Sequence, residues 1–412
     1  FIDGVRTPFQ ASGTGYKNLN CYDLGSTVLS NFKKILGNDV SDNIDYSIMG
    51  NVIQDSKTNN ISRESMLLSN FKKTIPSYTV NMACISSNKS ITEGVNLIQA
   101  NQAESVISSG VETMSDLPIK ISKPLRLKLF ESRKWKSLND KIKGISSIKL
   151  KDIGLEVPSI TEFSTNETMG YSADKLSEKW NVSRQEQDEY AYNSHKNASL
   201  AYSNGLLSDV ININNLKDNI IKHETNYKKL KNLKPSFRKN GTITAGNASA
   251  LTDGSSACLL CTKEFKEKYN LTAKSEIIDY IYYGTDPKDE LLLGPAYATA
   301  LLLNRNKLTT KDIDIVEIHE AFAGQVLSNL NALDSDLFCK SLSINKIGRF
   351  DNQKINSWGG SLSLGHPFGA TGVRLLTMAS NRLLKYNKEY GLITSCAAGG
   401  LGHAMIIKNS NF

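Results

Sequence analysis

The sequence lacks any apolar run close to the roughly 18 uninterrupted residues that a membrane-spanning helix needs. It also lacks the charged, apolar and small-residue order of a secretory signal peptide. Its six cysteines are too few and too scattered for a disulfide framework: Cys21, Cys84, Cys258, Cys261, Cys339 and Cys396. These absences predict a chain without membrane spans or disulfides, in a reducing compartment.

Signatures of several other protein classes are missing too. The glycine-rich string GHPFGATG, at 365–372, has no Gly-Lys-Ser/Thr and is not a phosphate loop; it also lacks the spacing of a dinucleotide site. Cys258 and Cys261 form a C-x-x-C inside the apolar run ACLLC, without a second pair or a nearby histidine. Buried strand residues are therefore favoured over a zinc or redox site, and no metal is predicted.

Helical and strand patterns alternate along the 412 residues, which is typical of an α/β protein. The length predicts two to three domains or one duplicated unit. The second part of the chain repeats the rhythm of the first. The predicted helices cover 23–36, 87–100 and the stretches after His319 and His366, and the predicted strands cover 77–82, 105–109, 313–318, 392–395 and 403–408.

A polar, lysine-rich region from about 116 to 240 interrupts this rhythm. It contains one clearly predicted helix, which begins at a capping box of Ser183 and Glu186 and ends at Gly205. The α/β pattern of the first part returns at 242–262. The first domain is therefore expected to be discontinuous.

The net charge of +8 is concentrated in the segment 120–151, where Leu, Ile, Phe and Trp are interleaved with lysine and arginine. A solvated basic face is one interpretation. A basic amphipathic segment lying on an anionic membrane is the other interpretation, and the sequence supports the two equally. Nucleic acid is not a predicted partner, because no recognised module accompanies the basic stretch.

Three glycine-rich turns carry the residues best suited to chemistry. Cys84 lies in VNMACISSNKS, Cys396 in ITSCAAGGLGH, and His366 is the one ionisable side chain of NSWGGSLSLGHPFGATG. Each turn follows a short apolar or β-branched run, a context that presents a side chain at the end of a sheet. Cys84 alone could be a buried small hydrophobe. It precedes a predicted helix, however, whose dipole would lower the thiol pKa and favour the reactive thiolate.

These strings, together with HEAFAGQ at 319–325 and GNASALTDGSSA at 246–257, closely resemble the thiolases. The resemblance runs from end to end, and the motifs occur in the order of that family. The stretches FIDGVRTPFQASGTGYKNL, EFSTNETMGYSADKLSEKW and DPKDELLLGPAYAT look most like the β subunits of the mitochondrial trifunctional enzyme and their bacterial relatives.

The resemblance implies a duplicated α/β fold with five layers, α-β-α-β-α, in which two similar five-stranded sheets enclose shared central helices. It also implies that a loop domain is inserted over the active site. The expected domains are an N-terminal domain at 1–115 continued at 242–265, a loop domain at 116–241 and a C-terminal domain at 266–412.

The resemblance also assigns roles to residues. Cys84 would be the nucleophile, His366 its base and Cys396 the second acid/base, while His319 would hold a water. One oxyanion hole would come from His366 and that water, and another from the backbone N–H groups of Cys84 and Ala398. Ser249, Phe322 and Met169 would line the site for the acyl and pantetheine groups. A histidine at the end of a strand, such as His319, can also be purely structural.

The activity so implied is cleavage of 3-ketoacyl-CoA by coenzyme A in fatty-acid β-oxidation, with no permanently bound cofactor. The alternatives are an acetoacetyl-CoA-forming thiolase and a non-catalytic lipid-binding subunit. Implied partners are a second copy of the chain and a hydratase/dehydrogenase α subunit, with a peripheral membrane contact through 120–151. The implied location is mitochondrial, in the matrix or at the inner-membrane surface, or else a bacterial cytoplasm.

Overall fold

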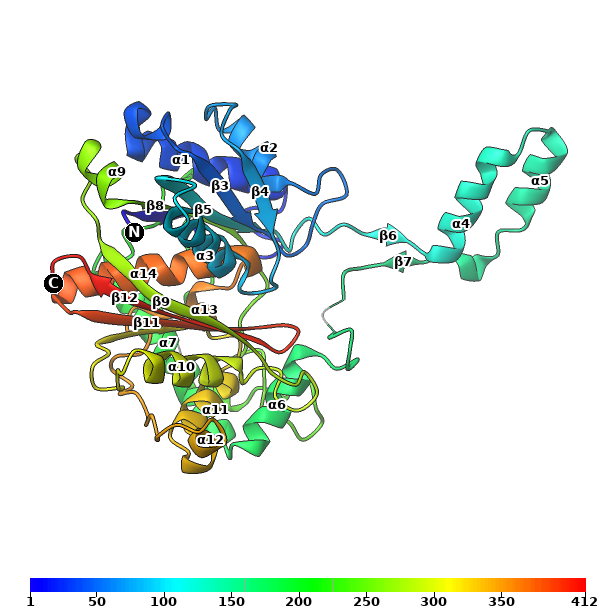
Figure 1. Cartoon of the computed structure of the whole chain (residues 1–412). Helices are drawn as coiled ribbons and strands as arrows, with labels where there is room; N and C mark the ends of the chain where they lie inside the picture. Colours follow the sequence, from blue (N-terminus) through cyan, green and yellow to red (C-terminus); the bar gives the residue numbers. More distant parts are fainter. Residues whose placement is uncertain (160, 225) are drawn as a thin grey trace.

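The computed structural model describes residues 1–159, 161–224 and 226–412. Its main body has five layers, which follow one another from top to bottom in Figure 1. Helices α1 (Cys21–Ser41) and α2 (Ile61–Leu68) cover a first sheet, and helices α3 (Ser86–Gln99) and α14 (Thr371–Tyr386) separate it from a second sheet. Helices α10 (Gly294–Arg305), α11 (Ala323–Leu333) and α12 (Asp336–Ser341) cover the far side. The predicted α-β-α-β-α architecture is confirmed.

The first sheet has the strand order β1-β8-β5-β3-β4, with the short strand β2 also paired to β8. Strands β4, β3 and β5 run parallel, so their carboxyl ends lie at one edge, whereas β8 is antiparallel to β5 and β1. The bounds are β1 (Gly4–Arg6), β2 (Gln10–Ala11), β3 (Tyr46–Gly50), β4 (Ser77–Val80), β5 (Ser105–Glu112) and β8 (Thr252–Cys261). Because β8 pairs with β5, the chain returns to its first sheet after the insertion.

Within the described residues, the second sheet has four strands rather than the expected five, in the order β10-β11-β12-β9. Strand β10 (Ile315–Ile318) is parallel to β11 (Tyr390–Ala397), and β12 (Leu401–Asn409) is antiparallel to β11 and to β9 (Ser275–Gly284). At the free edge of β10 the pairing is reduced to one parallel bridge between Val316 and Ile355. The duplication is thus imperfect, because the counterpart of β4 is only this bridge.

Helices α3 and α14 form the central layer and approach each other closely at their N-termini. Gly372 lies so close to Asn88 that an added Cβ would clash with the Asn88 backbone nitrogen. The Ser87 hydroxyl oxygen accepts hydrogen bonds from the N–H groups of Gly372 at 2.7 Å and Val373 at 3.4 Å. A residue of α3 therefore caps the first turn of α14, and the two helix N-termini are fixed at one place.

The core consists mainly of apolar faces that the layers turn toward one another. Val373, Leu376 and Leu383 of α14 pack with residues of both sheets, including Leu260 and Ile393. Larger clusters lie on the outer side of each sheet, beneath α1 in one case and beneath α10 and α11 in the other.

The insertion forms two different parts. Helices α6 (Met169–Lys179) and α7 (Arg184–Ser203) pack against α11 in the body, and α7 begins with the predicted capping box. By contrast, α4 (Lys123–Glu131) and α5 (Leu138–Ser146) form a helical hairpin that projects on a stalk of paired strands β6 (Lys120–Ile121) and β7 (Leu155–Glu156) (Figure 1). Shorter elements are α8 (Tyr227–Lys231), α9 (Lys263–Lys268), α13 (Ser361–Leu364), η1 (Ser132–Lys134), η2 (Leu150–Asp152) and η3 (Phe368–Ala370).

Neither α4 nor α5 has a buried residue, so the projecting hairpin contributes little to the core. Among the described residues, no helix is both long and apolar enough to cross a membrane.

Candidate active site

Cys84 lies on a tight turn between β4 and α3. Ala83 adopts a left-handed conformation with φ of 47°, which is unusual for a residue with a side chain. The Ser86 hydroxyl holds the turn closed, since it donates to the Ala83 carbonyl at 2.6 Å and accepts from the Met82 N–H at 2.8 Å. The nucleophile candidate is thus presented by a strained turn at the N-terminus of a central helix.

The environment of Cys84 favours the neutral thiol. Burial raises the pKa of Cys84 to about 11, although the N–H groups of Ala398 and of Cys84 itself favour the thiolate. Burial therefore outweighs the stabilisation of the thiolate that was expected from the helix N-terminus. A base has to remove the proton as the reaction proceeds.

His366 lies in the loop before α14 and is bound to the first sheet. Its backbone N–H donates to the Thr252 hydroxyl at 3.0 Å, and it forms a bridge with Leu251. Its ring nitrogen Nδ1 is 2.7 Å from the Thr371 hydroxyl. Burial, followed by the positive charge of Arg374, lowers the pKa of His366 to about 3. The imidazole is consequently neutral at physiological pH and can accept a proton.

His319 follows β10 directly and lies against His366, with ring centroids 3.9 Å apart. Burial, His366 and Arg374 all lower the pKa of His319. In the described part of the chain, neither Nε2 atom of this pair has a hydrogen-bond partner. Two neutral imidazoles therefore lie next to each other, and each has an Nε2 atom without a hydrogen-bond partner among the described residues.

Cys396 lies near the end of β11, in the strand register opposite Gly402. Burial raises the pKa of Cys396 well above its usual range, and the nearby Cys84 adds to this effect. The following turn, Ala398 to Gly400, brings the Ala398 N–H toward the Cys84 thiol. Cys84, Cys396 and Ala398 are thus brought together.

The three expected wall residues also come together. The 247–249 segment pairs with 321–323, since Ala248 bridges Phe322 and the Ser249 N–H donates to the Ala321 carbonyl at 2.9 Å. The Phe322 ring meets the Phe237 ring edge-on at 6.1 Å. Phe237 in turn covers Gly170, the neighbour of Met169.

Phe237 was missed by the sequence analysis, although an aromatic residue in the basic string KPSFRKNG was a usable signal. Glu112 was also missed. This buried carboxylate at the end of β5 accepts hydrogen bonds from the N–H groups of Val52, Ile53 and Gly369 at 3.0–3.1 Å. Burial raises the pKa of Glu112 to about 8. Since Gly369 belongs to the loop that carries His366, Glu112 fixes this loop to the first sheet.

The cysteine pair Cys258 and Cys261 lies in a strand and, among the described residues, not in a metal site. Cys258 is buried in β8, Cys261 is partly buried, and the described residues contain no group of three or more His, Cys, Asp or Glu that could hold a metal. Lys89, which follows Cys84 in the chain, is on the central helix α3, where an unpaired ammonium would be costly; it forms an ion pair with Glu93 and lies 5.6 Å from the centre of the Tyr282 ring.

Known proteins of one family are similar to this chain over nearly its whole length. The family models described as "Thiolase, N-terminal domain" and "Thiolase, C-terminal domain" match residues 1–264 and 271–409. The mitochondrial trifunctional enzyme subunit beta of Bos taurus is 46% identical, covering 99% of this chain and 87% of that protein. A probable 3-ketoacyl-CoA thiolase of Caenorhabditis elegans is 45% identical, with coverage of 99% and 93%.

Solved structures give the same result. Human mitochondrial 3-ketoacyl-CoA thiolase in complex with CoA superposes with a TM-score of 0.82 and 29% identity, covering 99% of this chain and 97% of that one. The acetyl-CoA acetyltransferase of Bacillus anthracis has a TM-score of 0.83 and 29% identity, with coverage of 99% and 98%.

The raised thiol pKa predicts how Cys84 reacts with iodoacetamide. Because only the thiolate reacts and its pKa is about 11, the alkylation rate should rise roughly tenfold per pH unit between pH 7 and 9.5. Peptide mass spectrometry quantifies labelling at Cys84, and circular dichroism at each pH verifies the fold. A rate that is already constant above pH 7 would show that the thiolate is preformed.

Proposed function

The chain belongs to the thiolase family and is a 3-ketoacyl-CoA thiolase of fatty-acid β-oxidation, and we propose that Cys84, His366 and Cys396 carry out its chemistry. The observation that carries this assignment is the convergence of two half-sites. Cys84 precedes the central helix α3 of the first half, and His366 precedes the central helix α14 of the second half; the N-termini of these helices are joined by the bond from Gly372 to Ser87. Cys396 lies near the end of β11, close enough to Cys84 to raise its own pKa further.

In the first step, the Cys84 sulfur attacks the 3-keto carbon of the substrate while His366 takes the thiol proton. The carbon–carbon bond between C2 and C3 then breaks, and its electron pair leaves on acetyl-CoA as an enolate. The Cys396 thiol protonates C2 of this enolate. The shortened acyl group remains on Cys84 as a thioester.

In the second step, the Cys396 thiolate takes the proton from the thiol of an incoming coenzyme A, the co-substrate. The coenzyme A sulfur attacks the acyl group, and Cys84 leaves and recovers its proton from His366. Negative charge develops on the thioester oxygen in this step. The N–H groups of Cys84 and Ala398 are the proposed donors to it.

Basic residues near Ser249 suit the phosphates of coenzyme A. Leu230 and Leu233 lie against Gly246, three residues from Ser249, and thereby place α8 beside the proposed pantetheine site. This stretch carries Lys228, Lys229, Lys231, Lys234 and Lys239. We assign the phosphates to this basic stretch, and the thioester arm to the wall formed by Phe322, Phe237 and Met169.

Substitution of Cys396 by serine separates the two chemical roles. Cys396→Ser should still acylate Cys84, while turnover falls by roughly 100-fold to 10,000-fold, as is usual when a general acid/base is lost. Intact-mass and peptide analysis with 3-ketoacyl-CoA detects the acyl group, and loss of 3-ketoacyl-CoA absorbance measures turnover. Cys339→Ser is the matched control, since Cys339 is buried on α12, on the outer side of the second sheet (Figure 1), where its thiol contacts the Leu333 carbonyl. Near-normal turnover of Cys396→Ser, or acylation of another cysteine, contradicts the assignment.

A second copy of the chain is the partner we propose for the free edge of β4. Among the described residues this strand pairs only with β3, and its residues Tyr78 and Val80 are partly exposed. An unpaired edge strand favours association with another chain. Light scattering should give the mass of a dimer for the wild type and that of a smaller species for Val80→Lys. An unchanged mass for the variant would exclude this edge.

The mitochondrial trifunctional enzyme relatives are named as β subunits. We therefore also propose a hydratase/dehydrogenase α subunit as a partner and a mitochondrial location, at the matrix face of the inner membrane.

The projecting hairpin suits an anionic membrane surface. Apolar side chains that would be costly to leave in water are exposed on it and its stalk, namely Leu127, Leu129, Phe130, Leu138, Ile142, Ile145, Leu150, Ile153, Leu155 and Val157. Basic side chains accompany them, and a groove of about 350 Å³ is lined by Lys120, Arg126 and Arg133 beside Leu129 and Phe130. We propose that the groove receives an anionic lipid.

Neutralising four lysines tests the membrane contact. The quadruple variant with Lys134, Lys136, Lys141 and Lys143 changed to Gln should lose sedimentation with anionic liposomes, since each basic residue near the surface contributes about 1 kcal/mol. The double variant with Lys263 and Lys268 changed to Gln, on exposed α9, is the control. If the wild type fails to sediment at low salt, or the quadruple variant sediments equally well, the hairpin serves another purpose.

A further inference from the structure

His319 and His366 are neighbours of the same residue type, yet their polar surroundings differ. Each ring uses Nδ1 for a hydrogen bond to a hydroxyl group, which belongs to Ser361 for His319 and to Thr371 for His366. A neutral imidazole carries one N–H and one acceptor nitrogen. If the hydroxyl group donates to Nδ1, the ring proton is on Nε2, which is then a donor; if the hydroxyl group accepts from Nδ1, Nε2 is an acceptor.

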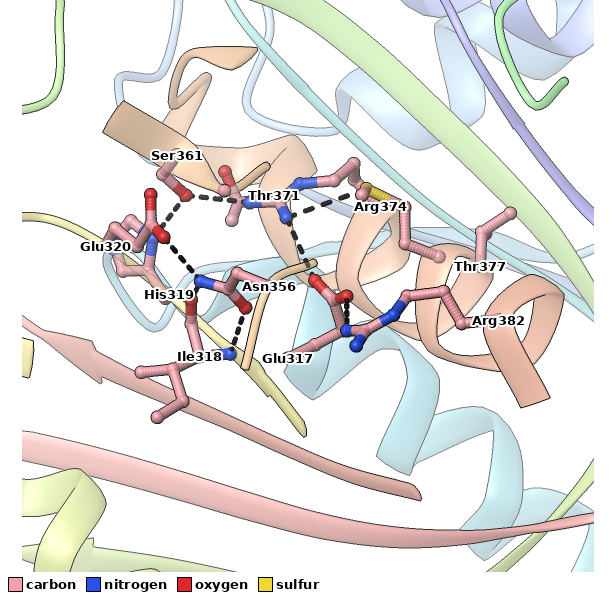
Figure 2. Close-up of polar contacts among 12 residues, drawn as sticks. Glu317, Ile318, His319, Glu320, Asn356, Ser361, Thr371, Arg374, Thr377 and Arg382 are labelled. Atoms are coloured by element: carbon pink, nitrogen blue, oxygen red, sulfur yellow. Dashed lines mark hydrogen bonds and ion pairs between the residues drawn. The ribbon is translucent and has the colours of Figure 1, made fainter. Parts of the chain in front are cut away.

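The proton of Ser361 is committed to His319. The Arg374 atom Nη2 lies 2.7 Å from the Ser361 oxygen, and arginine can only donate (Figure 2). No other acceptor lies within hydrogen-bond distance of the Ser361 hydroxyl in the described part of the chain, so its single hydrogen is left for the Nδ1 atom of His319, 2.8 Å away. With Nδ1 as acceptor, the proton of the neutral His319 ring is on Nε2.

The surroundings of His366 favour the opposite tautomer, with the ring proton on Nδ1. The Thr371 hydroxyl donates to the Pro367 carbonyl at 3.1 Å, so its oxygen receives the N–H from Nδ1 of His366. The Nε2 atom of His366 is then an acceptor, as a base for Cys84 requires. Both Nε2 atoms are buried without a protein partner in the part of the chain that the structure describes.

Arg374 is itself held in place by the fold. It lies on α14, is 1% exposed, and has its Nη1 atom 3.6 Å from Glu317 of β10, whose closer partner is Arg382 at 2.5 Å. Figure 2 shows Arg374 between this carboxylate on one side and Ser361 on the other. The ion pair thus orients the guanidinium, and the guanidinium orients the serine hydroxyl.

We propose that Arg374 and Ser361 are positioning residues that fix His319 as the Nε2–H tautomer, so that His319 donates a hydrogen bond toward the reacting oxygen. The neighbouring His366 accepts a proton at the same time. The inference rests on the proposed function, because that function supplies the oxygen to which His319 donates, either directly or through a water.

Nitrogen-15 NMR of the full chain tests the tautomer without any turnover. The protein has only five histidines, and labelled imidazole nitrogens have well-separated shifts when protonated and unprotonated. His319→Asn identifies the His319 signals by their loss. We expect a protonated Nε2 in the wild type and a shift toward the other tautomer in Ser361→Ala. A protonated Nδ1 in the wild type, or an unchanged spectrum in Ser361→Ala, overturns the proposal.

Kinetics provide the second readout. Ser361→Ala should lower kcat by roughly 10-fold to 100-fold, toward the loss seen when one oxyanion donor is removed, and leave KM nearly unchanged. Ser363→Ala is the matched control: it lies on the same short helix, is equally buried, and bonds to Ser194 rather than to a histidine. A comparable fall in kcat for Ser363→Ala would indicate a structural effect and contradict the proposal.

A double-mutant cycle separates positioning from packing. Asparagine has no tautomers, so Ser361→Ala should cost much less in a His319→Asn background than in the wild type. Equal costs in the two backgrounds overturn the proposal. If the expected tautomer is present but 3-ketoacyl-CoA is not cleaved, the proposed function fails and the positioning role stands; an active enzyme with the other tautomer gives the reverse outcome.

Discussion

The close crossing of α3 and α14 between the two sheets is the constraint on which the site depends. The contact of Gly372 with Asn88 and the capping of α14 by Ser87 bring the two helix N-termini together. The turn with Cys84 precedes one of these helices, and the loop with His366 precedes the other. A larger residue at Gly372 would separate the helices and, with them, the two half-sites.

Burial at this crossing determines the protonation states. It raises the pKa of Cys84 and Cys396 and lowers the pKa of His366 and His319. All four groups are therefore neutral before substrate binds, because a low-dielectric site disfavours every isolated charge. The charge that appears during the reaction has to be stabilised by oriented N–H groups, and we propose Ala398, Cys84 and, through Ser361, His319 as the donors.

Much of the fold follows from local sequence patterns. The alternation of helices and strands and the capping box at Ser183 were predicted, since apolar periodicity and caps act over short distances. The return of the chain to the first domain was expected because the α/β pattern reappears at 242–262. The fifth strand of the second sheet was wrongly expected. Near Ile355 the chain makes a single bridge, and no local signal distinguishes a bridge from a short strand.

By itself, the sequence determined the family, the fold class and the identity of Cys84, His366, Cys396 and His319 as candidates, because motifs record residue types in chain order. Only the tertiary structure showed how burial acts on their pKa values, where Phe237 and Glu112 lie, and how contacts lead from Arg374 through Ser361 to His319. The physical reason is that desolvation and hydrogen-bond direction depend on what surrounds an atom in space, and those neighbours come from distant parts of the chain.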